Sequence, residues 1–237
     1  MFGDRRVSLI FPAYNEEESI FRAVTEFAAV GVFDEIVVVN NRSSDRTEAE
    51  ALRAGARVVR EDIPGYGAAL TRGLKEATGD WLVLAEPDGT FVGTDVRKLL
   101  AYAGEFDMVC GTRTAPLMIW EGANMGYAIR WGNTLLAKVL EVVYSGPSLS
   151  DCGCTFRLIS RDGWKKIEPF ITVQGSHFLP EMVILALRLR LRVIEIPLNY
   201  RNRVGTSKIT GNWRGLVRTA LNMAGLIVRY VTFRPAR

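Results

Sequence analysis

Two carboxylates, Glu86 and Asp88, stand at the end of a short apolar run and have the spacing of a chemical site. The run from Trp81 to Ala85 is bounded by turn-forming residues, which is typical of a buried strand. Acids that follow a buried strand are suitable ligands for a hard cation, since Mg²⁺ or Mn²⁺ typically binds one or two carboxylates together with substrate phosphates. The pair therefore predicts a divalent-metal site. A solvated acidic turn is the alternative that this stretch leaves open.

Two further polar clusters also follow predicted strands. PAYNE (12–16) comes after an apolar run at 7–11, and NNRSSD (40–45) closes a second run at 34–40. Short apolar runs that alternate with helical patterns predict an α/β fold with a doubly wound, mostly parallel sheet. Ligands bind beyond the carboxyl ends of such strands. We therefore expect the three clusters to converge, which favours a site over an acidic turn.

The same periodicity predicts a single Rossmann-like domain over residues 1–210 and a C-terminal amphipathic helix within 211–237. The predicted strands are 7–11, 34–40, 57–60, 80–86, 107–111, 155–159 and 193–200. The predicted helices are 16–30, 45–54, one that begins at the GYGAAL segment (65–70), 94–103, 124–144 and 180–189.

The composition is that of an ordinary globular protein, with 48% hydrophobic and 24% charged residues in a chain of 237. The cysteines, Cys110, Cys152 and Cys154, are three in number, which does not suit a disulfide framework. No apolar stretch of signal-peptide length precedes the first acids. We therefore expect a cytoplasmic protein whose cysteines are small core residues.

The net charge of +4 hides an asymmetry along the chain. Residues 188–237 carry eleven Arg and Lys against one acid, which gives +10, whereas the remainder carries −6. A basic pole suits nucleic acid, anionic lipid or a phosphate-bearing substrate. Because the chain shows no nucleic-acid-binding module, we expect no nucleic-acid partner and favour lipid and phosphate.

The tail combines basic and apolar residues at helical spacing. Its longest uncharged stretch, 219–228, has ten residues, whereas about 20 are needed to span a bilayer. Arg214, Arg218 and Arg229 fall on one stripe, and Trp213 lies away from it with most of the large apolar residues. This pattern is typical of an interfacial helix. A terminal helix packed on the core is the alternative.

Seven segments, taken in order, resemble the inverting family 2 glycosyltransferases of GT-A fold. They are PAYNEEESI, NNRSSDRT, GYGAAL, EPDGT, GTR, DCGCTFRLISR and EIPLNYRNRVGTSKI. The last two are similar to the dolichyl-phosphate mannose synthase-like branch, which glycosylates polyprenyl phosphates. The resemblance covers residues 7–209. It implies a metal-dependent enzyme that moves a hexose, mannose or glucose, from a GDP- or UDP-hexose to a polyprenyl phosphate such as dolichyl or undecaprenyl phosphate.

The resemblance also implies a place of action, at the cytosolic face of a membrane. The protein would be peripheral there, docked on the bilayer or on a membrane partner subunit.

The resemblance also implies which residues bind the nucleotide sugar. They are Pro12, Ala13, Tyr14, Glu16, Asn40, Asn41, Asp45, Gly67, Glu86 and Pro87. Asp45 has an alternative as a helix N-cap, in a capping box with Glu48. Gly65 and Gly67 permit close backbone approach to the nucleotide or simply form a turn. Asn40 and Asn41 replace two aspartates of many relatives, so the donor base, uracil or guanine, stays open.

Glu86 and Asp88 match the metal-binding Asp-x-Asp motif of the family, with Glu in place of the first Asp. The resemblance implies Mg²⁺ or Mn²⁺ as the cofactor. We expect Asp88 to be the direct ligand and Glu86 to be the second metal-site residue.

Cations are needed because a diphosphate leaving group and a phosphate acceptor repel each other. The resemblance assigns Arg113, Arg157, Arg203 and Lys208 to phosphate binding in the catalytic site. Arg201 stands beside Arg203 at a place where the spacing departs from the family pattern, so either could act. For each of these cations, a solvated surface charge is the alternative.

The acceptor decides the mechanism. A lipid phosphate is already anionic and attacks without a base, whereas a sugar hydroxyl needs a carboxylate base. Asp151 and Glu181 are the candidate bases for a hydroxyl acceptor, and Asp151 is otherwise a catalytic-site residue that orients Arg157 or the acceptor site. For both acids, a surface charge on a helix or loop is the alternative. A hydroxyl acceptor is thus the second hypothesis. A non-catalytic nucleotide-binding module is the third, suggested by the altered metal motif and the Asn pair.

Overall fold

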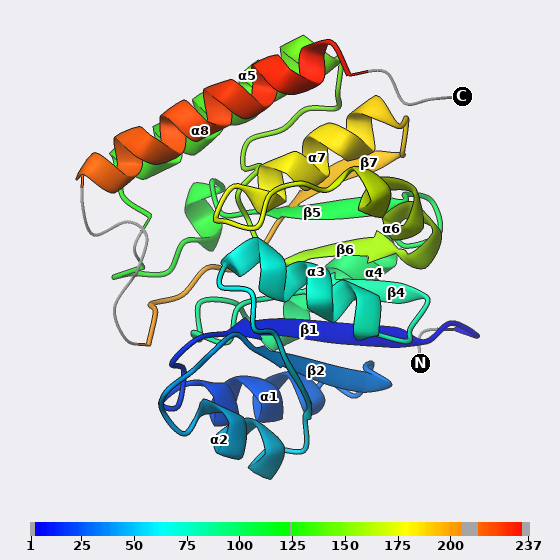
Figure 1. The fold of residues 1–237 in the computed structure, drawn as a ribbon, viewed down its shortest axis with the longest axis vertical. Helices are drawn as coiled ribbons and strands as arrows, with labels where there is room; N and C mark the ends of the chain where they lie inside the picture. The colour runs from blue at the N-terminus through cyan, green and yellow to red at the C-terminus, as the bar shows by residue number, and fades with distance from the viewer. Residues whose placement is uncertain (1–2, 124, 205–212, 234–237) are drawn as a thin grey trace.

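The structure is a computed structural model that describes residues 3–123, 125–204 and 213–233. Its strands form one seven-stranded sheet in the order β3-β2-β1-β4-β6-β5-β7 (Figure 1). The strands are β1 (Val7–Ala13), β2 (Glu35–Asn40), β3 (Arg57–Arg60), β4 (Trp81–Leu84), β5 (Met108–Thr112), β6 (Arg157–Ser160) and β7 (Val193–Pro197). Within this sheet β6 is antiparallel to both of its neighbours, and the other pairings are parallel. The predicted mostly parallel α/β fold is confirmed.

Helices cover both faces of the sheet (Figure 1). They are α1 (Ile20–Ala28), α2 (Thr47–Arg53), α3 (Tyr66–Glu76), α4 (Val96–Ala101), α5 (Tyr127–Tyr144), α6 (Arg161–Ile167), α7 (Phe178–Arg188) and α8 (Trp213–Val231), with single 3₁₀ turns η1 (Gly93–Asp95), η2 (Pro116–Met118) and η3 (Glu168–Phe170). Strand β1 shows how the sheet divides the core. Ile10 packs into the cluster beneath α3 and α7, whereas Leu9 and Phe11 pack into the cluster beneath α1 and α4, because successive strand residues point to opposite faces.

Several predicted elements are shortened where loops build the ligand-binding edge. The helix predicted at 16–30 begins at Ile20, and the strand predicted at 80–86 ends at Leu84. Helix α6 was not predicted. Its N-terminus is capped by Ser160, whose Oγ accepts a hydrogen bond from the Gly163 amide, as N-cap serines do.

One face of helix α8 packs on the domain. This agrees with the alternative reading of the tail, a terminal helix packed on the core. Met223, Leu226 and Tyr230 are buried in the same cluster as α5 and α7. The Tyr144 hydroxyl donates to the Ile227 carbonyl at 2.7 Å. The boundary proposed at residue 210 lies outside the described residues. In the described part of the chain, no helix has the length and apolar character to cross a bilayer.

Candidate active site

A pocket of about 530 Å³ lies where β1, β2 and β4 end. The three polar clusters therefore converge, as expected from the sheet topology. Nine of the predicted site residues line it: Pro12, Ala13, Tyr14, Glu16, Asn41, Glu86, Pro87, Asp88 and Arg203. The remaining walls come from Arg42, Pro64, Gly65, Tyr66 and Ala69.

Glu86 is held by two hydroxyl groups from distant parts of the chain. The Tyr66 and Thr155 hydroxyls lie 3.1 and 2.7 Å from Glu86 Oε1, and 2.5 Å from each other. Burial and then the neighbouring Asp88 carboxylate raise the pKa of Glu86 to about 7. The trio joins the GYG, EPD and DCGCT segments at one point of the pocket wall.

Asp88 is almost wholly buried and has one oxygen free of hydrogen bonds. Its Oδ1 accepts bonds from the Thr90 amide at 3.0 Å and the Thr90 hydroxyl at 2.6 Å. Its Oδ2 has no hydrogen-bond partner, although Arg203 Nη1 lies 3.2 Å away as an ion pair. Thr90 therefore fixes the carboxylate so that a single oxygen remains available in the pocket.

These two carboxylates fit a divalent cation that shares its coordination with a diphosphate. A buried carboxylate oxygen without a hydrogen bond is costly unless a ligand completes it. Among the described residues, no group of three or more His, Cys, Asp or Glu side chains could hold a metal by itself. A site of Glu86 and Asp88 alone suits Mg²⁺ or Mn²⁺, which retain water and substrate phosphates as ligands.

The structure separates the two arginines that the sequence left equivalent. Arg203 lines the pocket and lies 3.9 Å from Glu16 Oε1 as well as beside Asp88. Arg201 instead binds both oxygens of Glu26, at 2.9 and 3.0 Å, away from the pocket. Arg203 is therefore the one of the two that can meet a ligand in the pocket. Lys208 lies outside the described residues.

The amides of Asn40 and Asn41 are engaged by the protein itself. Asn41 Nδ2 donates to the carbonyls of Glu61 and Ile63, and its Oδ1 accepts from the Gly65 amide. Asn40 Nδ2 donates to Glu48 at 2.9 Å. Asn40 does not line the pocket. Asn41 thus shapes the wall at 61–65, and a contact of either amide with the base remains a prediction.

Asp45 and Gly67 also stand behind the pocket wall. Asp45 accepts bonds from the Thr47 and Glu17 amides, which joins the loop after β1 to the loop after β2. The capping box is not formed, because Glu48 binds Asn40 and Arg60 instead. A Cβ atom on Gly67 would lie 2.6 Å from the Val173 carbonyl oxygen. The close approach at Gly67 is therefore to segment 173–174 of the chain.

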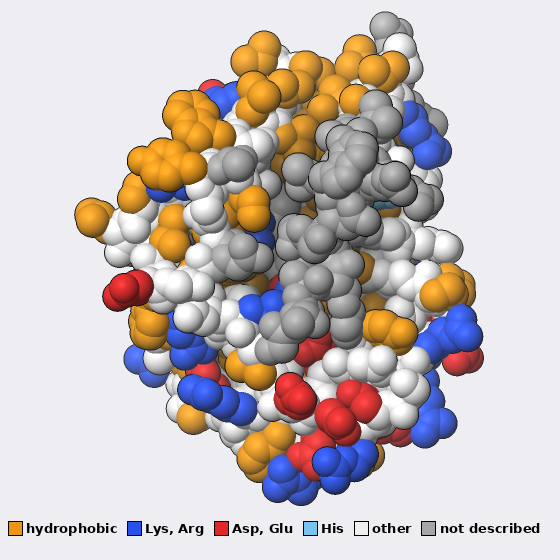
Figure 2. All heavy atoms as spheres, turned by 90° about the vertical axis from the view of Figure 1, so that its left-hand side faces the viewer, with side chains coloured by type: hydrophobic (Ala, Val, Ile, Leu, Met, Phe, Trp, Pro, Cys, Tyr) orange, Lys and Arg blue, Asp and Glu red, His pale blue; other side chains and the backbone are white. Residues whose placement is uncertain are grey.

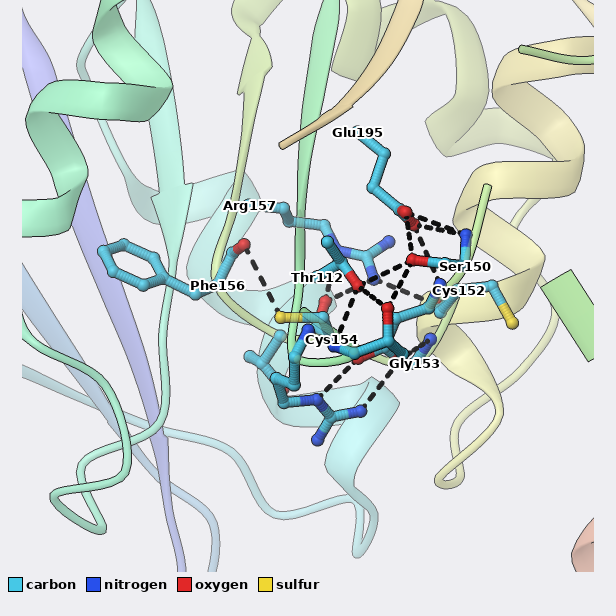
Figure 3. A network of polar contacts seen from close by, with 12 residues as sticks. Thr112, Ser150, Cys152, Gly153, Cys154, Phe156, Arg157 and Glu195 are labelled. Carbon is cyan, nitrogen blue, oxygen red and sulfur yellow. Dashed lines mark hydrogen bonds and ion pairs between the residues drawn. The ribbon is translucent and has the colours of Figure 1, made fainter. Parts of the chain in front are cut away.

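Arg113 and Asp151 form a buried ion pair beside the pocket. Arg113 Nε lies 2.7 Å from Asp151 Oδ2, and Nη2 lies 3.0 Å from Oδ1. The Glu195 carboxylate accepts hydrogen bonds from the backbone amides of Ser150 and Asp151. Figure 3 shows the contact between Glu195 and Ser150. The loop that carries Asp151 is fixed by these bonds. Neither member of the pair lines the pocket.

Arg157 occupies the core and is fully buried. Its guanidinium donates to the carbonyls of Cys152, Cys154 and Leu179 (Figure 3 shows the loop that carries the cysteines). It does not line the pocket, and within the described part of the chain its hydrogen bonds go to these carbonyls and not to Asp151. In this structure Arg157 holds segment 152–154, and a contact with phosphate remains a prediction.

Glu181 is the second candidate base and is also fully bonded. Its carboxylate accepts from the Thr172 and Val173 amides, from the Thr172 hydroxyl and from the Tyr230 hydroxyl at 2.7 Å. His177 precedes α7 and lines a separate cavity with Arg229. The three cysteines are buried and free, as expected of small core residues.

Two polar pocket residues, Tyr66 and Arg42, were not singled out from the sequence, and neither was Thr155, which supports Glu86 without lining the pocket. Tyr66 and Thr155 stand inside recognised motifs, but the contact between their hydroxyls joins positions 89 residues apart in the chain. Arg42, with φ of 63°, adds a second cation to the pocket wall beside Arg203. A non-glycine residue in a left-handed conformation follows Asn41 here, and the sequence carries no clear signal of it.

The fold has the GT-A architecture of solved glycosyltransferase structures, and comparison with known proteins gives the family. The model of glycosyl transferase family 2 matches residues 8–167, and the chain belongs to this family. The predicted enzyme class, a glycosyltransferase, is confirmed.

Among its relatives is the low-salt glycan biosynthesis hexosyltransferase Agl6 of Haloferax volcanii, 30% identical over 93% of this chain. The chain spans 54% of that relative's length. The dolichyl-phosphate beta-glucosyltransferase ALG5D of Trichomonas vaginalis is 27% identical, and the match covers 94% of this chain and 73% of that one. A solved structure of similar fold is glucosyl-3-phosphoglycerate synthase from Mycobacterium tuberculosis with Mn²⁺, UDP and phosphoglyceric acid. Its TM-score is 0.75 at 20% identity, covering 98% of this chain and 81% of that one.

Proposed function

We propose that this protein transfers a hexose, glucose or mannose, from a nucleotide diphosphate sugar to a polyprenyl phosphate. The names of two relatives, a hexosyltransferase and a dolichyl-phosphate glucosyltransferase, support the sugar class and the acceptor. UDP-glucose bound in a structure of similar fold favours a UDP-hexose over a GDP-hexose donor. The proposed place of action is the cytosolic face of a membrane.

The observation that carries this proposal is the state of the two candidate bases. Both carboxylate oxygens of Asp151 accept hydrogen bonds from Arg113. Both oxygens of Glu181 accept hydrogen bonds from segment 172–173, and one of them also accepts from the Tyr230 hydroxyl. Neither lines the pocket. A carboxylate base must reach the proton that it removes. A phosphate acceptor needs no such base, because it is already ionised near pH 7.

The pocket residues then have distinct tasks. Glu86 and Asp88 would hold Mg²⁺ or Mn²⁺, which stabilises the negative charge of a departing diphosphate. Arg203 and Arg42 offset like charges in the same pocket. Tyr66 and Thr155 keep the Glu86 carboxylate in place. Binding and alignment, rather than proton removal, are the work of this chain.

Transfer of labelled sugar into an organic-extractable product tests the proposal. The full chain is mixed with a short polyprenyl phosphate and with UDP-glucose, GDP-mannose or UDP-N-acetylglucosamine, in Mn²⁺, Mg²⁺ or EDTA. We expect metal-dependent label in the lipid phase from UDP-glucose or GDP-mannose. Nucleotide binding without transfer from any donor would overturn the proposal and favour a binding module.

A hydroxyl acceptor is the second candidate, since a protein of the same fold binds phosphoglyceric acid. It predicts that Asp151→Asn or Glu181→Gln abolishes turnover while nucleotide-sugar binding survives. A phosphate acceptor leaves at least one of these variants substantially active, provided that the variant is folded.

A further inference from the structure

Helix α5 exposes large apolar side chains on the side opposite its core contacts. Tyr127, Trp131, Leu135 and Val142 are 75, 66, 68 and 78% exposed. We call these four residues, together with the partly exposed Val139, the α5 outer face. Their spacing places them along one side of the helix, whereas the residues that bury α5 lie on the other side. A helix with apolar side chains on both sides is expected to be shielded from water on both sides.

The neighbouring helix extends this apolar surface. Val228 and Val231 of α8 are 71 and 50% exposed, and the hydrogen bond from Tyr144 to Ile227 places the two helices side by side (Figure 1). Figure 2 shows hydrophobic side chains gathered in its upper part, whereas charged side chains gather at the opposite end. The exposure values show that the described part of the chain leaves the α5 outer face open.

The charges and aromatic residues of α5 indicate what covers it. Tyr127 and Trp131 are the residue types enriched at membrane interfaces. The Arg130 guanidinium lies 4.6 Å from the centre of the Tyr127 ring, and Lys138 is exposed on the same helix. The only acid of α5, Glu141, is paired with Lys138 at 2.6 Å. Exposed apolar and aromatic residues beside a net positive charge, here +1 from Arg130 and Lys138 against Glu141, are typical of a helix that lies on anionic lipid.

The aromatic end of the α5 outer face is linked to the pocket through backbone pairing. Trp120, which precedes α5, donates its amide to the Tyr200 carbonyl at 2.9 Å, and Tyr200 donates to Met118. Tyr200 is three residues from Arg203, which lines the pocket. A surface bound by this end of α5 would therefore lie on the pocket side of the molecule.

We propose that the α5 outer face docks the protein onto an anionic lipid bilayer. The inference rests on the proposed function in one respect, because a polyprenyl phosphate acceptor resides in a membrane. It adds that the bilayer itself, rather than a partner subunit, covers α5, and that exposed residues of α5 carry the contact.

Flotation of the full chain with vesicles tests this docking. The vesicles are pure phosphatidylcholine or contain 30% phosphatidylglycerol. The variant Trp131→Gln/Leu135→Gln should lower the partition coefficient on anionic vesicles by about tenfold or more, because it removes two apolar side chains from the contact. Leu52→Gln on α2 is the matched control, since Leu52 is 55% exposed and α2 lies at the end of the molecule opposite α5 (Figure 1). Its binding should stay within about twofold of the unmodified protein.

Three results would overturn the docking proposal. The first is unchanged vesicle binding by the double variant, and the second is equal binding of the unmodified protein to neutral and anionic vesicles. The third is a dimer in sedimentation that the double variant converts to a monomer, which would assign the face to a second copy.

A transfer assay on the same samples separates this inference from the proposed function. Vesicle binding that depends on α5, without sugar transfer, would uphold the docking surface and reject the acceptor. Sugar transfer without α5-dependent vesicle binding would uphold the polyprenyl phosphate acceptor and reject the docking surface.

Discussion

Asp88 Oδ2 and Arg203 Nη1 lie 3.2 Å apart at the wall of the pocket. Thr90 occupies the other oxygen of Asp88, so the oxygen that a metal would use is the one beside Arg203. A cation and a guanidinium compete for this position by charge. We therefore expect Arg203 to turn toward the diphosphate when metal and nucleotide bind together.

Replacing Asp88 should remove metal-dependent activity. Asp88→Asn keeps the acceptor for Thr90 but lowers the charge at Oδ2, so we expect Mn²⁺ affinity in the presence of UDP to fall by about 100-fold or more. Calorimetric titration with Mn²⁺ measures this. Asp62→Asn is the control, because Asp62 is exposed and does not line the pocket. Equal affinities in the two variants would reject Asp88 as a ligand.

Arg201 and Arg203 should behave differently when each is changed to Gln. Arg203→Gln should lower kcat/KM by about 10-fold or more, because the pocket loses a charge beside the ligand. Arg201→Gln should instead lower the free energy of unfolding by about 1 to 3 kcal/mol, since it removes the ion pair with Glu26. Thermal unfolding and steady-state kinetics on both variants test the contrast. The reverse pattern would exchange the two roles.

The Tyr66 hydroxyl should act by positioning Glu86. Tyr66→Phe retains the aromatic ring but removes one of the two hydroxyls at Glu86 Oε1. We expect metal affinity to fall by about 10-fold while the melting temperature changes little. Thr155→Val should have a similar effect. A Tyr66→Phe variant with full metal affinity and a lower melting temperature would show that the hydroxyl serves stability alone.

Glu86 should make the metal-free protein less stable as pH rises. Its pKa is raised to about 7 in the folded protein, from an ordinary value of 4.5, so the folded state favours the protonated form. The free energy of unfolding of the metal-free protein should therefore fall as the pH rises from 4.5 to 7, and should level off above pH 7. Glu86→Gln should therefore stabilise the metal-free protein by roughly 2 to 3 kcal/mol at pH 8, and by less than about 1 kcal/mol at pH 5. Urea unfolding at the two pH values measures this, and equal gains would contradict the assigned pKa.

The sequence by itself determined the sheet and the edge where the site lies. Apolar runs such as Trp81 to Ala85 specify buried strands because backbone pairing and apolar burial depend mainly on local residue types. Parallel connections then bring the ends of β1, β2 and β4 to one edge. The prediction that Glu86, Asp88 and PAYNE would meet therefore needed no coordinates. The order of the motifs along the chain also sufficed to predict the family.

Tertiary structure decided which polar side chains reach the pocket and which support it. Arg201 and Arg203 are two residues apart, yet Glu26 binds the first and Asp88 faces the second. Arg157 was predicted at the phosphates, but carbonyls of the 152–154 loop and of α7 surround its guanidinium. The partners of a long charged side chain come from whichever loops pack beside it. That packing depends on β6 being inserted antiparallel between β4 and β5, which residue spacing does not encode.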